Sequence, residues 1–382
     1  MATTMREVAE AAGVSIATVS FVVNNSKPVA PKTRERIERA MAELGFRRNV
    51  VARALASRRT QIIALVYPVL EHRLAGSVTE FITSAARATS AADHHLVVWP
   101  VSNDGSELAA LVGQKLVDGV LLMEVQLDDA RVAALRELDI PFSLIGRTRD
   151  VTGLHYVDID FDATLRIAMD HLAELGHHRI VLIDGSEDDK SFASYGPYVR
   201  SEIAYRELCA QRGIEPMVLR CRQTVRSGRD AAMELVATAP ETTAVIIADE
   251  AAATGLVAEL ARIGRPVPGD ISVMSIMSSL DMAAMCNPPL TTVTAPGTEL
   301  GQLGVESLRR PLDGGPPLSP VLRAGVLAVG ESTGPIHARP KPTSAAPARS
   351  DLQPAAPQLS GQPPRLRSPV GCGQIDGGST GT

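Results

Sequence analysis

The 382-residue chain lacks the sequence patterns of several protein classes. Its four cysteines show no C-x-x-C or metal-type spacing, so we expect free thiols and neither a disulfide framework nor a zinc site. No basic N-terminal region precedes an apolar run, and the longest apolar runs have only the length of strands. We therefore expect a cytoplasmic protein without a signal peptide or a membrane span.

Motifs of common enzyme classes are also missing. The chain contains no G-x-x-x-x-G-K-[ST], no H-E-x-x-H, no G-x-S-x-G and no G-x-G-x-x-G after a strand. His171, His177 and His178 cluster in DHLAELGHHR, where we interpret them as structural. The sequence thus predicts no catalytic residue, no cofactor and no metal site.

Charge divides the chain into two unlike parts. Residues 1–60 hold eleven Lys and Arg against five Asp and Glu, a net charge of +6. Since the whole chain carries −5, residues 61–382 carry −11. A basic head on an acidic body predicts contact with phosphates at one end only.

Residues 8–24 show the pattern of a helix-turn-helix. Apolar residues recur at helical spacing on both sides of Gly13, which supplies the turn. Ser15 stands at the N-cap of a second helix, from Ile16 to about Asn24. The three valines of this helix would pack inward, and its first turn would meet base edges in a major groove. A plain helical hairpin is the alternative for these residues taken alone.

Residues 31–46, PKTRERIERAMAELGF, add a third helix. Pro31 fits its first turn, and Ile37, Ala40, Met41 and Leu44 share one face. The basic segment RRNVVARALASRRT that follows is too short to bury a face of its own. We expect it to be helical only when an external partner orders it.

GVSIATVSFVVN, KTRERIERAMAELGF and NVVARALASRRT, in this order and spacing, resemble the DNA-binding domain and hinge of the LacI/GalR family of bacterial transcription regulators. The resemblance implies a helix-turn-helix domain over 1–48 and a hinge helix over 49–60 in a minor groove, with Leu55 as an apolar wedge between base steps. A linker leucine resting on the core is the alternative for Leu55. The DNA-binding residues would be Ser15, Ile16, Ala17, Thr18, Ser20, Phe21, Asn24, Thr33, Asn49, Ala52, Arg53 and Leu55.

The head departs from the family pattern at four positions. Ile16, Ala17 and Phe21 stand where polar or basic residues are usual. Without amide or guanidinium groups there, bidentate recognition of guanine or adenine is lost, and apolar contact with thymine methyls remains. Ala30 stands where a serine often caps the third helix, a loss of about 1 kcal/mol.

From Gln61 onward, short apolar runs alternate with helical ones, which predicts an α/β fold. A first unit would hold the buried parallel strands IIALVYP, HLVVWPV, VDGVLLMEV and PFSLIG. A second would hold RIVLIDG, MVLRC, AVIIAD and ISVMSIM, and LTTV and VLAVG follow. These patterns alone leave a Rossmann enzyme possible.

VDGVLL, AMDHLAELGHHRIVLIDG, VPGDISV, NPPLTTV and GESTGP resemble the same family. The resemblance implies an effector-binding and dimerisation core over 61–335, a periplasmic-binding-protein-like pair of doubly wound parallel-sheet subdomains. The first would span about 61–160 and 293–320, and the second about 161–292 and 321–335. The implied partners are a pseudo-palindromic double-stranded DNA operator, a small-molecule effector and a second copy of the chain in a homodimer or higher homo-oligomer.

The effector cleft is expected at the carboxyl ends of strands, where open α/β sheets bind ligands. Asp249 and Met277 stand at such ends, and Asp160 precedes a helix. By resemblance, Asp249 and Arg200 match effector-binding positions, although RSEIAY departs from the usual R-x-x-G-[FY]. Met277 and Phe161 replace a usual Asp and Asn, which favours a ligand with an apolar part and one or two polar anchors over a simple hexose. A purely structural role for Asp249 and Met277 is the alternative.

The last segment differs in composition. Residues 336–382 contain eight prolines and no aromatic residue, so we expect a disordered tail, with an auxiliary DNA contact as the alternative. The whole chain is interpreted as a transcriptional repressor. A transport-type small-molecule binding protein and an α/β enzyme of related fold are the two competing interpretations.

Leu55→Ala should reduce specific DNA affinity more than nonspecific affinity, because a wedge acts only where the DNA is kinked. Titrations of an operator fragment and a random fragment of equal length would measure both. Equal losses on the two fragments would favour the linker interpretation.

Overall fold

The computed structural model describes residues 3–23, 27–46, 59–68, 76–185 and 194–336. Its first part is a three-helix unit of α1 (Met5–Ala12), α2 (Ile16–Val23) and α3 (Pro31–Glu43). Gly13 ends α1 in the left-handed region at φ +60°, as the predicted turn requires. The Ser15 hydroxyl accepts from the Thr18 amide at 3.1 Å, which confirms the predicted cap of α2. Ala30 provides no side-chain cap to α3.

The head has its own small core. Val8, Val19 and Ile37 are fully buried and lie in one cluster with the other inward-facing residues of the three helices. Leu44, predicted to share this core, is 39% exposed because α3 ends before it, at Glu43. The sequence also missed the cap of α1, where Thr4 and Glu7 bond to each other's backbone amides.

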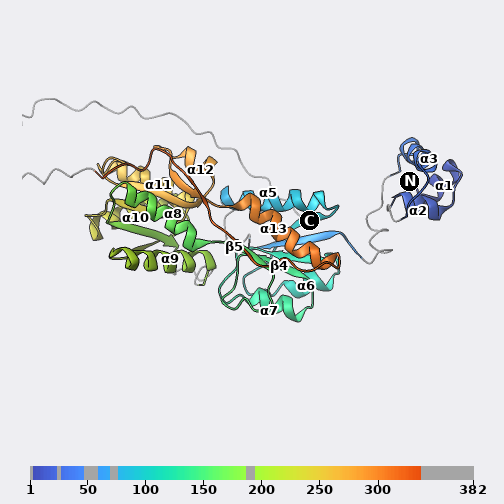
Figure 1. Cartoon of the computed structure of the whole chain (residues 1–382), viewed down its shortest axis with the longest axis horizontal. Coiled ribbons are helices and arrows are strands. Elements are labelled where there is room, and N and C mark those ends of the chain that lie inside the picture. Colours follow the sequence, from blue (N-terminus) through green and yellow to red (C-terminus); the bar gives the residue numbers. More distant parts are fainter. Residues whose placement is uncertain (1–2, 24–26, 47–58, 69–75, 186–193, 337–382) are drawn as a thin grey trace, which may run out of the picture. The chain divides into compact units, whose positions relative to one another are not determined.

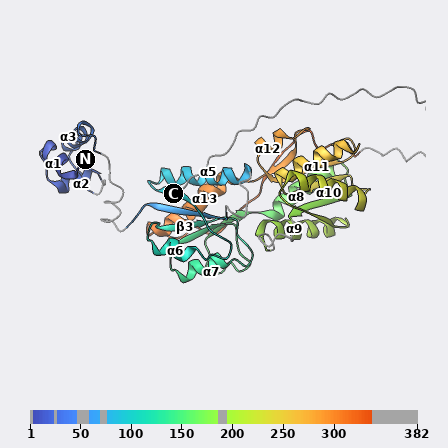
Figure 2. The same ribbon diagram turned by 180° about the vertical axis from the view of Figure 1, so that it is seen from behind.

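The first sheet of the core has the strand order β11-β5-β4-β3-β1-β2, with every pairing parallel. Its strands are β1 (Ile62–Tyr67), β2 (His95–Pro100), β3 (Gly119–Leu122), β4 (Phe142–Ile145), β5 (Tyr156–Ile159) and β11 (Val321–Arg323). Helices α5 (Gly76–Ala91) and α13 (Gly297–Leu312) cover one face, and α6 (Leu108–Gly113) and α7 (Ala130–Glu137) cover the other (Figure 1). The view from behind shows the same layers (Figure 2).

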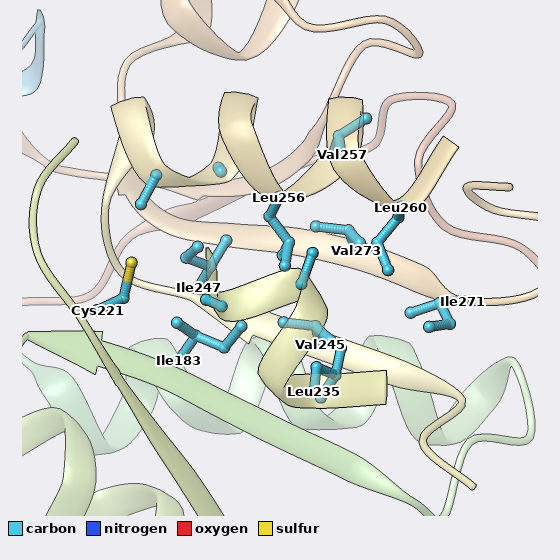
Figure 3. Packing of buried hydrophobic residues seen from close by; sticks show 14 of the residues in the cluster. Ile183, Cys221, Leu235, Val245, Ile247, Leu256, Val257, Leu260, Ile271 and Val273 are labelled. Carbon is cyan, nitrogen blue, oxygen red and sulfur yellow. The ribbon is translucent and has the colours of Figure 1, made fainter. Parts of the chain in front are cut away.

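The second sheet has the order β12-β10-β9-β8-β6-β7, parallel except for β12. Its strands are β6 (Ile180–Gly185), β7 (Met217–Cys221), β8 (Ala244–Ile247), β9 (Ser272–Ser278), β10 (Thr291–Thr294) and β12 (Val326–Ala328). Its helices are α8 (Phe161–Glu174) and α9 (Gly196–Arg212) on one face, α10 (Val225–Thr238) and α11 (Glu250–Arg262) on the other, and the short α12 (Leu280–Met285). Leu256 and Leu260 of α11 point at Val245 and Val273 of the sheet (Figure 3).

The chain crosses between the two sheets three times, after β5, after β10 and between β11 and β12. The predicted pair of doubly wound subdomains is thereby confirmed. The crossing points differ slightly from the predicted ones, because Thr294 still pairs in the second sheet and Val321–Arg323 pairs in the first. Strands β5 and β11 and helix α12 were not predicted.

HLVVWPV was predicted as a buried strand, and this was wrong. The strand β2 lies at the edge of the first sheet, hydrogen-bonded to β1 alone. Val97 and Val98 are consequently 37% and 41% exposed. An apolar run identifies a strand but does not tell an edge strand from a central one.

The histidines of DHLAELGHHR hold the end of the core in place. The Nε2 atom of His171 lies 2.9 Å from the Thr333 hydroxyl, and that of His177 lies 3.0 Å from the Gly334 carbonyl. Ser332, fully buried, accepts from the Thr291 amide at 2.8 Å. This geometry supports the structural interpretation of His171 and His177.

None of the described helices is long and apolar enough to cross a membrane.

Ser332→Ala should lower the free energy of unfolding by about 1 to 3 kcal/mol, because it leaves the buried Thr291 amide without its acceptor. Removal of residues 337–382 should leave the melting temperature nearly unchanged, as the composition of that segment predicts. Thermal unfolding of both variants beside the intact chain measures this. A larger loss of stability on removal of residues 337–382 than in Ser332→Ala would show that the folded core extends beyond residue 336.

Candidate functional site

The predicted DNA-reading residues of α2 lie on its outer side. Ile16 is 45% exposed and Ala17 is exposed, while Thr18, Ser20 and Phe21 are half-buried. Thr33, at the start of α3, is also half-buried. The predicted contacts Asn24, Asn49, Ala52, Arg53 and Leu55 lie outside the described residues, as do most of the predicted hinge and nearly all of the predicted tail.

Phe21 makes a contact that a polar residue at its position would not make. The Lys27 ammonium lies over its ring, 5.0 Å from the centroid. A cation is thus held next to the exposed side of α2 through an aromatic ring. Lys27 contributes to the net charge of +6 that residues 1–60 carry, a charge that can meet phosphates.

The second candidate site is a cavity between the two sheets of the core. It forms where the carboxyl ends of strands from both sheets meet, the position at which open α/β sheets bind ligands. Its described lining comes from the ends of β1, β3, β4, β5, β8 and β9 and from helices α5, α8, α9, α11 and α13. The polar lining residues are Tyr67, Ser77, Glu124, Asp158, Tyr195, Tyr198, Gln223, Asp249 and Glu250.

Three of the five predicted effector residues line this cavity: Phe161, Asp249 and Met277. Phe161 begins α8 and is 3% exposed. Asp249 caps α11 by accepting from the Ala252 amide at 2.6 Å. Burial removes solvent from its carboxylate and raises the pKa of Asp249 to about 6.

Met277 enters the cavity through a distortion of the sheet. Ile276 pairs with Val293 and Ser278 pairs with Thr294, so Met277 is bulged out of register with the neighbouring strand. Its φ of +62° lies in the left-handed region, which costs a non-glycine residue about 1 to 2 kcal/mol. The side chain packs against the cores of both subdomains.

Asp160 and Arg200 are not among the residues that line the cavity. Asp160 caps α8, accepting from the Ala163 amide at 3.0 Å. Arg200 donates to the Arg147 carbonyl at 2.6 Å, and its guanidinium lies 4.0 Å from Asp158, so the side chain bridges from α9 to the first sheet. Arg200 was predicted as a ligand contact because its position in the sequence matches a family motif. The direction in which its side chain points depends on the tertiary structure.

Several cavity residues were missed by sequence reasoning. Glu124, which follows β3, adopts a φ of +54° and is hydrogen-bonded by Tyr195, and burial raises its pKa. Gln223 donates from its side-chain amide to the Tyr198 hydroxyl. Glu124 could have been noticed as a charged residue inside the run VDGVLLMEV. Tyr195 and Tyr198 carried no sequence signal, because they begin a helix rather than end a strand.

Glu250 joins the two subdomains at the cavity. Its carboxylate accepts from the Gly76 amide of α5 at 2.9 Å and from the Ser279 amide at 2.6 Å. A Cβ at Gly76 would lie 2.7 Å from the Ser279 hydroxyl and 2.8 Å from Met282 Cγ, so a larger residue there would displace these side chains. The carboxylate therefore holds α5, attached to the first sheet, against residues of the second.

Comparisons with known proteins agree with this architecture. Residues 4–49 match the family of bacterial regulatory proteins of the lacI type, and residues 169–333 match the periplasmic binding protein-like domain family. The chain is 33% identical to the HTH-type transcriptional regulator CelR of Thermobifida fusca over 319 residues, which cover 80% of this chain and 92% of the relative. It is 30% identical to the lactose operon repressor of Escherichia coli over 312 residues, 80% and 83% of the two chains.

Solved structures show the same similarity. A lac repressor dimer bound to operator and the anti-inducer ONPF matches with a TM-score of 0.74 at 25% identity, covering 87% of this chain and 100% of that chain. A CelR–cellobiose complex matches with a TM-score of 0.64 at 29% identity, covering 86% and 99%. Both the head and the two-sheet core thus have counterparts within single known proteins.

Glu250→Ala should lower the free energy of unfolding by about 1 to 3 kcal/mol for each buried amide left without an acceptor. Glu241→Ala is the matched control, because that glutamate makes only a surface ion pair with Arg179 and its loss should change stability by less than about 0.5 kcal/mol. Denaturant unfolding compares the two. Equal effects would show that Glu250 does not hold the subdomains together.

Proposed function

Because the chain belongs to the lacI family of bacterial regulatory proteins, we propose that this DNA-binding transcriptional regulator is a repressor whose operator affinity is set by a small molecule in the core cavity. The observation that carries the proposal is the union, in one chain, of a basic helix-turn-helix head with a cavity between two sheets. The protein works by binding and not by catalysis, and it acts in the cytoplasm, where the chromosome is accessible.

For the DNA, the proposed base contacts come from the exposed start of α2. Ile16 and Ala17 offer apolar surface to thymine methyls, and Ser15, Thr18 and Ser20 offer hydroxyls. Thr33 and Asn24 would add contacts from the neighbouring segments. Asn49, Ala52, Arg53 and Leu55 would contact a minor groove, on the strength of the sequence resemblance.

For the effector, the proposed direct contacts are Phe161, Asp249 and Met277. Asp160 and Arg200 would act indirectly, by fixing α8 and by bridging α9 to the first sheet. A ligand that binds one arrangement of the two sheets better than another shifts the population between them. Three crossing segments link the sheets, so this change would be a rotation about those segments and would alter operator affinity reciprocally.

For assembly, the proposed unit is a homodimer on a pseudo-palindromic operator, with two heads on two half-sites. The similar lac repressor structure is a dimer bound to its operator. The exposed Val97 and Val98 of edge strand β2 are apolar surface that such a dimer could cover.

Selection from random DNA should yield a site with two inverted half-sites. The log of the binding constant should fall with log salt by about 0.9 for each phosphate neutralised. A chain of residues 61–382 is the control and should lose both the site preference and the salt dependence. Unchanged DNA binding by this control would contradict the proposed role of the head.

A further inference from the structure

The cavity is unusual in its charge. Four carboxyl groups line it, those of Glu124, Asp158, Asp249 and Glu250, and its described lining contains no Lys, Arg or His. A formal excess of negative charge on buried side chains is costly, because each carboxylate loses solvation and repels the others. Burial raises the pKa of Glu124, and it raises those of Asp158 and Asp249 to about 6, in accordance with this cost.

Two of the four carboxylates are balanced by the protein. Asp158 lies 3.4 Å from the Arg147 guanidinium. Glu250 accepts from two backbone amides, as described above. The atom that faces the Arg147 guanidinium is Oδ2 of Asp158, which also lies 4.0 Å from Arg200, and it accepts no hydrogen bond from any residue that the structure describes, although Asp158 is 4% exposed and lines the cavity. This oxygen retains capacity for a donor from the cavity.

The other two carboxylates are less well compensated. Asp249 accepts from backbone amides at the start of α11, a cap that a neutral Asn would make equally well. Glu124 accepts from the Tyr195 hydroxyl. Arg131, whose charge also acts on Glu124, is itself buried in an ion pair with Asp129 at 2.8 Å. A positive group on a ligand would therefore enter a lining that holds two such carboxylates.

Aromatic rings complete the site. Only twelve residues of the chain are aromatic, yet five of them line this cavity: Tyr67, Phe81, Phe161, Tyr195 and Tyr198. The rings of Tyr195 and Tyr198 stand edge to face with centroids 4.9 Å apart. Aromatic faces attract cations as well as apolar groups, so rings and carboxylates favour the same kind of ligand.

We propose that the effector of this cavity is a small organic cation, a protonated amine carried on an apolar or ring-shaped body, with its ammonium group near Asp249 and Glu124. The proposal rests on the proposed function, since it names the ligand class of the same site. The body of the ligand would lie against Phe161, Met123 and Met277. Neutral hydroxyl compounds of the same shape would leave the two carboxylates without a counter-charge.

Two matched pairs of probes test the charge directly: 2-phenylethylamine against 2-phenylethanol, and glucosamine against glucose. Isothermal titration at pH 7.5 should show at least a tenfold preference for the amine in one pair. Asp249→Asn should weaken binding of that amine by roughly 10- to 100-fold, the range of a hydrogen bond to a charged group. The alcohol of the pair should change by less than about threefold, because Asn keeps the helix cap.

Asp162→Asn is the matched control, because Asp162 is an exposed carboxylate in the first turn of α8 and should leave amine binding unchanged. Glu124→Gln is the second test variant if Asp249→Asn folds poorly, since it keeps an acceptor for Tyr195. A thermal-shift screen of primary amines and neutral metabolites extends the probes. Absence of any amine among the compounds that stabilise the chain would overturn the proposal, as would a preference for the alcohols in both pairs.

The outcomes separate this proposal from the proposed function. Release of operator DNA by a neutral compound, lost in Phe161→Ala, would reject the cationic ligand and keep the effector-controlled repressor. Failure of the intact chain to select any DNA site would reject the proposed function, whatever the cavity binds.

Discussion

The core depends on one geometric constraint: two mainly parallel sheets direct the carboxyl ends of their strands at the same space, and the chain must pass through that region three times. Parallel strands place their following loops and helix starts at one edge. Residues far apart in sequence, such as Glu124, Asp158 and Asp249, are thereby brought to one cavity. The crossing segments also make this region the only covalent connection between the two subdomains of the described core.

Electrostatics then decides how the two subdomains are held. Glu250 reaches two backbone amides, one on each side of the cavity, and Arg200 reaches from α9 to the carbonyl of Arg147. These contacts are hydrogen bonds to charged groups, which are stronger than neutral ones and depend on close geometry. A rotation of the sheets would break them together. The contacts that stabilise this arrangement would therefore change if a ligand in the cavity rotated the sheets.

The head of the chain has few polar groups with which to recognise DNA bases. Its core is made of small aliphatic side chains, and its reading helix begins with apolar residues rather than amides or guanidinium groups. Affinity for DNA in such a head comes mainly from phosphate contact, and discrimination comes from shape, methyl groups and a few hydroxyls. The regulator thus separates the electrostatic attraction for DNA, in its basic head, from the acidic cavity proposed as its effector site.

Much of the architecture could be predicted from the sequence, because helix caps, strand runs and their alternation are local. Ser15, Gly13 and the buried runs of both sheets all behave as their neighbours in sequence dictate. Asp249 and Met277 also reached the cavity as predicted, since the carboxyl ends of strands can be recognised in the sequence, whereas Phe161 had been named through the family resemblance. Periodicity could not show that β2 lies at an edge, because burial of a strand depends on how many neighbours it has.

The chemistry of the cavity was decided by the tertiary structure. Met277 points into it because a bulge shifts β9 out of register, and Arg200 turns away because a carbonyl of the other subdomain lies within its reach. Tyr195, Tyr198 and Glu250 acquire their roles only when two sheets close on one another. The sequence by itself determined the fold, the basic head and the location of a cleft, since these follow from local patterns and composition. Which side chains share that cleft, and the negative charge they create together, depended on tertiary contacts, which join residues as far apart as the 174 positions between Gly76 and Glu250.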